Sequence, residues 1–572
     1  MSRYALLACA ATIAFVCPAG LHAADVSKHC AIPTDAMRAQ VAAATASYED
    51  AEPPLWDNLG SATYPITTRN PQAQAFFDQG LKLSYGFNHA EARRAFRMAQ
   101  KLDPTCALCF WGEALVLGPN INVPMMPEAQ APALAALKQA QALAAGASAK
   151  ERALIAALAK RYSETPPADR APLDGAYADA MAALSDAYPD DLDIAALAAE
   201  AAMDTQPWEY WQPGGHDPKG RAGDAIKRIE GILAKDPLHA GAIHLYIHLV
   251  EASDRPERAE KYADTLAALM PGAGHIVHMP SHIYYRIGRY DDSLTLNEAA
   301  VKVDEAYLAQ TGAVGVYPLG YTSHNIHFVL VSAQLLGDKA TVPTVLAAAD
   351  KLDGWIGNDV AAAIPIAQPI KAAPYFAWAQ FADADKLVAL PQPAGAPPYV
   401  EAMWHYARGV GLAEKGDAAG ARDEASKIEA LEKTADWSAM DQFAIPARDI
   451  LRVAQNVVLA RAAQAKGDPA ESITYFQAAA GVQDSLPYME PPYWYYPVRQ
   501  SLGAALLKAG RAKEAADQFR TALDGARKSA WALFGLREAA KATGDAATEQ
   551  QAADELAKSW RGDPGFLSLE RL

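Results

Sequence analysis

Seven of the thirteen histidines lie between residues 244 and 327, and four of them form two identically spaced pairs. His244 and His248 are followed 34 residues later by His278 and His282. Side chains four residues apart on a helix lie one turn above each other, so two such imidazoles can converge on one ion. Neutral imidazole is the commonest side-chain ligand of transition metals. The spacing therefore predicts metal coordination by histidines that project from helices.

The repeat length of 34 residues indicates which elements must position these histidines. It is the length of the tetratricopeptide repeat (TPR), a helix–turn–helix unit whose copies stack into a superhelix with a concave inner groove. Inner helices that begin at Ala240, Gly274 and Ser323 place Glu251 and all seven histidines at positions facing the groove. The predicted metal ligands among them are His244, His248, His275, His278, His282, His324 and His327.

The number of predicted ligands suggests more than one metal ion, and other roles of these histidines also have to be considered. Seven imidazoles and Glu251 exceed the roughly four to six donors that one transition metal takes, so two ions fit the set. Two alternatives stay open: packing histidines with ordinary hydrogen bonds, and groove histidines that bind an anionic ligand. Packing is the usual role of a single histidine, but here it must account for seven histidines at inner positions.

A second group combines two thiols with a carboxylate at Cys106, Cys109 and Glu113. If Gly112 matches Gly80 of the preceding repeat, these three residues take the same inner positions as the histidines, whereas counting from Pro104 moves the cysteines out of the groove. Two cysteines three residues apart can chelate a soft metal or form a redox disulfide. A simple structural disulfide between them, or a bond from one of them to Cys30, remains an alternative.

The donor types favour copper, with zinc as the alternative. Imidazole suits several metals, but added thiolates and the thioethers of Met125, Met126 and Met279 favour copper. We therefore predict a copper-dependent oxidoreductase that acts on a small molecule, in which Cys106 and Cys109 bind or exchange electrons with the metal and Glu251 or Glu113 moves protons. The alternative functions are a scaffold that binds a peptide or protein in the concave groove, and a metal store or carrier of the cell envelope.

Further TPR spacing along the chain predicts the fold class and its segments. We expect an all-α fold, a TPR-type α-solenoid in which helical hairpins form a right-handed superhelix with irregular loop insertions. The pattern is closest over 76–104 and recurs over 502–522. The predicted segments are a signal peptide at 1–23, an N-terminal extension at 24–70, a solenoid with a Cys/His-lined groove at 71–390, a Pro-rich linker at 391–400 and C-terminal TPR-like repeats at 401–572.

The chain start and the overall charge bear on location and partners. The first 23 residues combine a basic start at Arg3, a short apolar run and a small residue at Ala23, which predicts a secretory signal and a periplasmic or secreted protein. We expect no membrane span, because no later apolar run reaches about 18 residues. The formal net charge of −16 argues against nucleic acid as a partner. Oligomeric state is left open.

Several strings resemble a family of bacterial exported TPR proteins. The most specific are C-x-x-C-x-W-G at 106–112, H-x-x-x-H within 244–253, H-M-P-S-H-I-Y within 274–290 and H-N-x-H-F at 324–328. The segments 88–92 and 118–122 also take part in the resemblance. The resemblance covers most of the chain after the predicted signal. It implies a TPR fold but no assigned reaction.

His244 and His248 also have the spacing of a zinc protease, but Leu245 stands where the catalytic Glu is required.

Overall fold

The computed structural model describes residues 45–167, 169–336 and 341–572. The predicted signal peptide and Cys30 lie outside the described residues. The described chain is all-α, with a single isolated β-bridge between Trp211 and Pro218 and no strand in these ranges. The prediction of an all-α TPR-type solenoid is confirmed.

The chain forms two compact units, which we call unit A and unit B. Unit A comprises residues 46–283 and 299–313, and unit B comprises 284–298 and 314–572. The predicted Pro-rich linker at 391–400 lies within unit B. The helix that follows this Pro-rich segment, α20 (Pro398–Glu414), packs against α18 (Ala367–Phe381) and α19 (Ala384–Val388) inside unit B. The segment is therefore a connection within one unit.

Unit A consists of short amphipathic helices, each of which packs against its neighbour in sequence. Its helices are α2 (Pro71–Tyr85), α3 (His89–Leu102), α4 (Ala107–Val116), α5 (Gln130–Leu143), α6 (Ala149–Leu158), α7 (Ala171–Ala187), α8 (Leu192–Met203), α9 (Ala222–Lys235), α10 (Ala240–Val250), α11 (Glu260–Leu269) and α12 (Gly274–His278). The residues of α13 (Pro280–Ile287) and α14 (Tyr290–Thr311) are divided between the two units.

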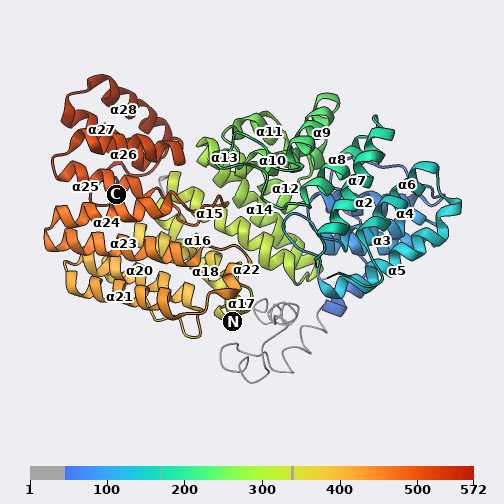
Figure 1. Cartoon of the computed structure of the whole chain (residues 1–572), viewed down its shortest axis with the longest axis horizontal. Coiled ribbons are helices and arrows are strands. Elements are labelled where there is room, and N and C mark those ends of the chain that lie inside the picture. Colours follow the sequence, from blue (N-terminus) through green and yellow to red (C-terminus); the bar gives the residue numbers. More distant parts are fainter. Residues whose placement is uncertain (1–44, 168, 337–340) are drawn as a thin grey trace. The chain divides into compact units, whose positions relative to one another are not determined.

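Unit B continues with a π-helical turn at Tyr317–Thr322 and a longer series of helices. From α20 onward, successive helices pack as a regular series of hairpins, which Figure 1 shows in orange and red. Besides α18, α19 and α20, the helices are α15 (Ser323–Leu336), α16 (Thr341–Trp355), α17 (Asn358–Ala363), α21 (Ala418–Thr434), α22 (Ser438–Gln442), α23 (Ala447–Lys466), α24 (Pro469–Gln483), α25 (Val498–Lys508), α26 (Ala512–Gly525), α27 (Ala530–Thr543) and α28 (Ala546–Ser559).

Glycine and phenylalanine at fixed spacing explain the close packing of the hairpins. A Cβ atom on Gly80 would lie 2.7 Å from the ring of Phe96, and one on Gly112 would lie 2.4 Å from the same ring. Only glycine lets both helices approach this buried ring, so Gly112 takes the same place in its repeat as Gly80. The arrangement recurs in unit B at Gly503, Phe519 and Gly535.

The helices that carry the histidines begin at the residues that the sequence predicts. The first residues of α10, α12 and α15 are Ala240, Gly274 and Ser323. The structure differs at one point, because the helix with His278 is interrupted at Met279 and resumes at Pro280. Proline has no backbone N–H and its ring crowds the preceding turn, which accounts for the interruption.

Candidate metal centre

His244 and His248 face each other through the same ring nitrogen. Their Nε2 atoms are 3.1 Å apart, and both rings are buried on α10. The Nδ1 atom of His244 lies 2.6 Å from the carbonyl oxygen of Tyr85, and Nδ1 of His248 lies 2.8 Å from Glu251 Oε1. Carbonyl and carboxylate oxygens only accept hydrogen bonds, so each Nδ1 carries the proton. The lone pairs of both neutral rings therefore sit on the facing Nε2 atoms.

The second histidine pair repeats this geometry. The Nε2 atoms of His278 and His282 are 2.8 Å apart, and His282 Nδ1 donates to Glu251 Oε2 at 2.6 Å. Glu251 thus accepts one imidazole N–H from each pair, and its carboxylate is fully buried. Burial raises the pKa of Glu251, but His282 and the hydrogen bonds from His248 and His282 outweigh burial and lower this pKa to about 2. Glu251 therefore stays ionised and fixes the orientation of both rings.

His275 brings a third imidazole to the first pair. One ligand nitrogen from each of His244, His248 and His275 lies within 4.8 Å of the other two. The ring of His275 is 4.9 Å from that of His244 and 5.8 Å from that of His278, measured between centroids. Burial holds the pKa of His244 and of His275 well below the usual 6.5, so both rings are neutral at pH 7. Neutral imidazole is the form that binds metal.

Two aromatic residues cover the histidines of unit A, and both have backbone conformations that bulky residues rarely adopt. Phe87 has a φ angle of +54° and Trp208 has a φ angle of +65°. The ring centroid of Phe87 lies 4.4 Å from that of His244, and the ring centroid of Trp208 lies 5.3 Å from that of His248. Such conformations cost roughly 1–3 kcal/mol and persist where the surroundings impose them, often at functional sites. Phe87 is 2% exposed and Trp208 is 40% exposed. The histidines thus lie behind an aromatic cover.

The remaining predicted histidine ligands belong to unit B. His324 and His327 lie on α15. His327 is buried, its Nε2 atom lies 2.9 Å from the hydroxyl of Tyr495, and burial lowers its pKa to about 3. The ring of His324 lies 5.0 Å from that of Phe328. A metal-binding role of these two residues stays a prediction.

The structure shows the contacts of the cysteines and of Glu113, whose predicted catalytic roles stay predictions. Cys106 and Cys109 are joined by a disulfide at the start of α4, and neither sulfur of a disulfide is a thiolate ligand. A disulfide between these two cysteines is one of the arrangements that the spacing allows. Glu113 accepts hydrogen bonds from Arg93 Nε at 3.1 Å and from Gln100 Nε2 at 2.8 Å. These partners give Glu113 a structural ion-pair contact.

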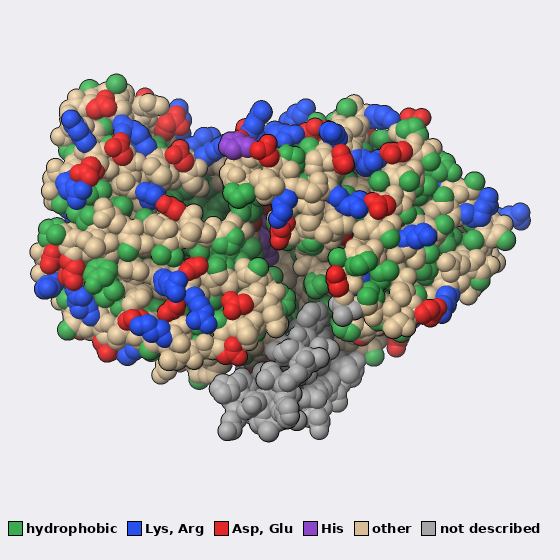
Figure 2. Space-filling model, viewed as in Figure 1, with side chains coloured by type: hydrophobic (Ala, Val, Ile, Leu, Met, Phe, Trp, Pro, Cys, Tyr) green, Lys and Arg blue, Asp and Glu red, His purple; other side chains and the backbone are tan. Residues whose placement is uncertain are grey.

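The surface of the described residues bears on partners. On the face drawn in Figure 2, basic and acidic side chains are interspersed and histidine shows at only a few points. Within the described ranges, no helix is long and apolar enough to cross a membrane.

Comparisons with known proteins find similarity only among solved structures. No family model and no curated protein matches the chain. Among solved structures, it is similar to a human IFIT1 dimer with PPP-AAAA at 12% identity, covering 84% of this chain and 88% of that chain with a TM-score of 0.31. Yeast Tom70 has 12% identity, coverages of 86% and 93%, and a TM-score of 0.25. The TPR domain of P58(IPK) is 13% identical, and the similarity covers 83% of this chain and 99% of that chain with a TM-score of 0.22. Similarity at this level carries no argument about function.

Proposed function

We propose that unit A binds a transition metal ion between His244, His248 and His275, and a second ion at the pair His278 and His282. The observation that carries the proposal is the pair of facing Nε2 atoms, repeated at 3.1 Å and 2.8 Å. Two neutral imidazoles with lone pairs aimed at each other repel unless a proton or a cation lies between them. For His244 and His248, burial lowers the pKa of both rings, which disfavours the proton.

The separations also suit coordination. Two imidazole nitrogens bound tetrahedrally at about 2.0–2.1 Å from one metal lie about 3.3–3.4 Å apart. The observed distances require each pair to open by a few tenths of an ångström. Glu251 supports this arrangement, because a carboxylate that accepts the far N–H of a ligand imidazole fixes its tautomer and raises its basicity.

Copper is the metal we propose, with zinc as the alternative. Without thiolates, the donor set is imidazole, for which divalent copper has the highest affinity in the first-row series. We propose that the site serves an exported oxidoreductase acting on a small molecule, and that the half-exposed Trp208 lies on the route by which such a molecule approaches His248. A metal store would need exposed ligands for exchange, and a peptide-binding scaffold would not need facing imidazoles.

Metal analysis of matched histidine variants tests the proposal. The mature protein, purified without chelators and loaded with Cu²⁺ or Zn²⁺, should hold tightly bound metal measurable by elemental mass spectrometry. With Cu²⁺, nitrogen hyperfine splitting in the paramagnetic resonance spectrum should report imidazole ligands. His248→Gln should lose metal from the first pair. His405→Gln is the control, because His405 is also buried and hydrogen-bonded to a carboxylate, that of Glu424. Full metal occupancy in His248→Gln would refute the site.

A further inference from the structure

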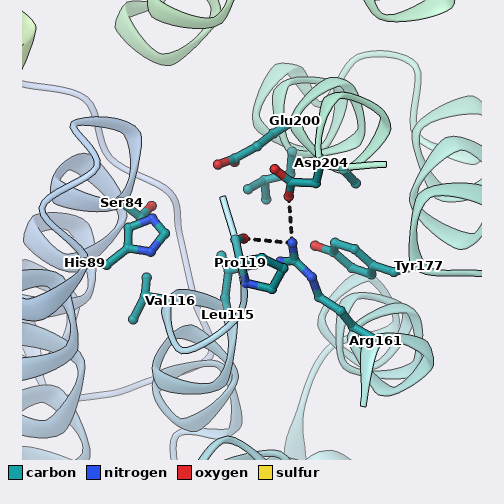
Figure 3. Close-up of a pocket in the computed structure, with 11 residues that line it drawn as sticks. Ser84, His89, Leu115, Val116, Pro119, Arg161, Tyr177, Glu200 and Asp204 are labelled. Carbon is teal, nitrogen blue, oxygen red and sulfur yellow. Dashed lines mark hydrogen bonds and ion pairs between the residues drawn. The ribbon is translucent and has the colours of Figure 1, made fainter. Parts of the chain in front are cut away.

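Unit A contains a second group of buried titratable side chains, which lines a small pocket. Figure 3 shows Glu200 and Asp204 on one wall, His89 and Ser84 on the opposite wall, and Arg161 beside Tyr177. The cavity measures about 10 Å³ and holds about one water-sized group. The pocket shares no residue with the proposed metal centre.

Arg161 is already committed to partners in this pocket. Its Nη2 atom donates to Asp204 Oδ2 at 2.6 Å and to the carbonyl oxygen of Pro119 at 2.8 Å. Its guanidinium also stacks over the ring of Tyr177 at 4.8 Å. One positive charge is thus neutralised by one carboxylate of the pocket.

The pocket is left with more hydrogen-bond acceptors than donors. Asp204 is 8% exposed, and its Oδ1 atom has no hydrogen-bond partner among the described residues. Glu200 lies one turn earlier on α8 and lines the same space. Ser84 Oγ donates to the carbonyl oxygen of Leu81 at 2.7 Å, so that its lone pairs remain available. A ligand that donates hydrogen bonds therefore fits these walls.

The charges of the pocket select a cation. Burial and the neighbouring Asp204 raise the pKa of Glu200 to about 8, against a smaller lowering by Arg161. Burial likewise raises the pKa of Asp204 to about 7 despite Arg161. His89 supplies no positive charge at pH 7, because burial lowers its pKa to about 4. Both carboxyls also lie at the C-terminal end of α8, where the helix dipole disfavours negative charge. At pH 7 the two carboxyls therefore retain a proton, which a bound cation would replace.

We propose that this pocket binds the protonated head of a small primary amine, held by Glu200 and by Asp204 Oδ1. An ammonium head is about the size of the water that the cavity admits, and its N–H groups match the acceptors. Calcium is a poor fit, because it takes six to eight oxygen ligands. The proposal does not depend on the metal centre.

Calorimetric titration of the full chain with methylammonium chloride tests this inference. The wild type should bind methylammonium, while tetramethylammonium, which has the same charge but no N–H, should not bind. Glu200→Gln should weaken methylammonium binding by at least about tenfold, because the amide lacks the charge. Asp190→Asn is the matched control, since Asp190 is exposed and pairs with Lys235. Circular dichroism should show that both variants are folded.

Proton release provides a measurement on the wild type alone. At pH 7, methylammonium binding should release protons from the carboxyls, which appears as a dependence of the binding heat on the ionisation enthalpy of the buffer. Absence of methylammonium binding, equal binding of tetramethylammonium or potassium, unchanged affinity in Glu200→Gln or binding without proton release would each overturn the proposal. In those cases the pocket holds water or a spherical cation.

Discussion

Glu251→Gln separates an orienting role of Glu251 from simple packing. The carboxylate accepts an N–H from His248 at 2.8 Å and from His282 at 2.6 Å. A glutamine side chain keeps the volume but offers one carbonyl oxygen and one NH₂ group. The NH₂ group cannot accept the second imidazole N–H, so one ring must change its tautomer. That ring then carries its proton on Nε2, the atom proposed to bind metal.

The expected loss follows from this tautomer change. Removal of a carboxylate that supports a ligand imidazole typically weakens metal binding 10- to 100-fold, or about 1.4–2.7 kcal/mol. Competition against a chelator of known affinity measures the change. Glu230→Gln is the control, because Glu230 also accepts a hydrogen bond, from Tyr246 at 2.7 Å, but does not contact the histidine pairs. A dissociation constant of Glu251→Gln within about twofold of wild type would refute the reasoning.

Three further changes test other parts of the structure. Gly112→Ala should destabilise the protein by about 1–3 kcal/mol in urea unfolding, because its Cβ would lie 2.4 Å from Phe96, whereas Gly231→Ala, with open space around it, should be neutral or stabilising. The double change Cys106→Ser and Cys109→Ser should leave the metal content by mass spectrometry unchanged, and loss of an ion would restore the thiolate interpretation. Glu200→Gln should raise the melting temperature more at pH 8 than at pH 5. Folding raises the pKa of Glu200 from 4.5 to about 8, so this carboxyl destabilises the folded protein increasingly as pH rises through that range, and glutamine removes the effect. An equal effect at both pH values would count against this pKa.

The positions of the histidines could be predicted because they depend on periodicity. The repeat of 34 residues relates the starts of α10 and α12, whereas α15 follows after a longer interval, and all three helices begin at the predicted residues. The four-residue spacing of His244 and His248 then places two rings together on any helix. The interruption at Pro280 does not separate His278 from His282, because their Nε2 atoms still lie 2.8 Å apart.

Other parts of the site depend on contacts that no local pattern encodes. The carbonyl of Tyr85 meets His244 although 159 residues separate them in sequence. Phe87 and Trp208 adopt positive φ values, and neither residue type signals such a conformation. The contact of Trp208 with His248 follows from packing. Spacing alone also could not distinguish a thiolate pair from the disulfide of Cys106 and Cys109.

Anomalous X-ray diffraction at the copper edge tests the central claim most directly. Crystals of the mature protein grown with Cu²⁺ should give a peak about 2.0–2.1 Å from Nε2 of both His244 and His248, with the ring of His275 turned toward it. A second, separate peak is expected at Nε2 of His278 and His282. Anomalous peaks confined to surface residues, or no peak at either pair in fully loaded crystals, would contradict the account.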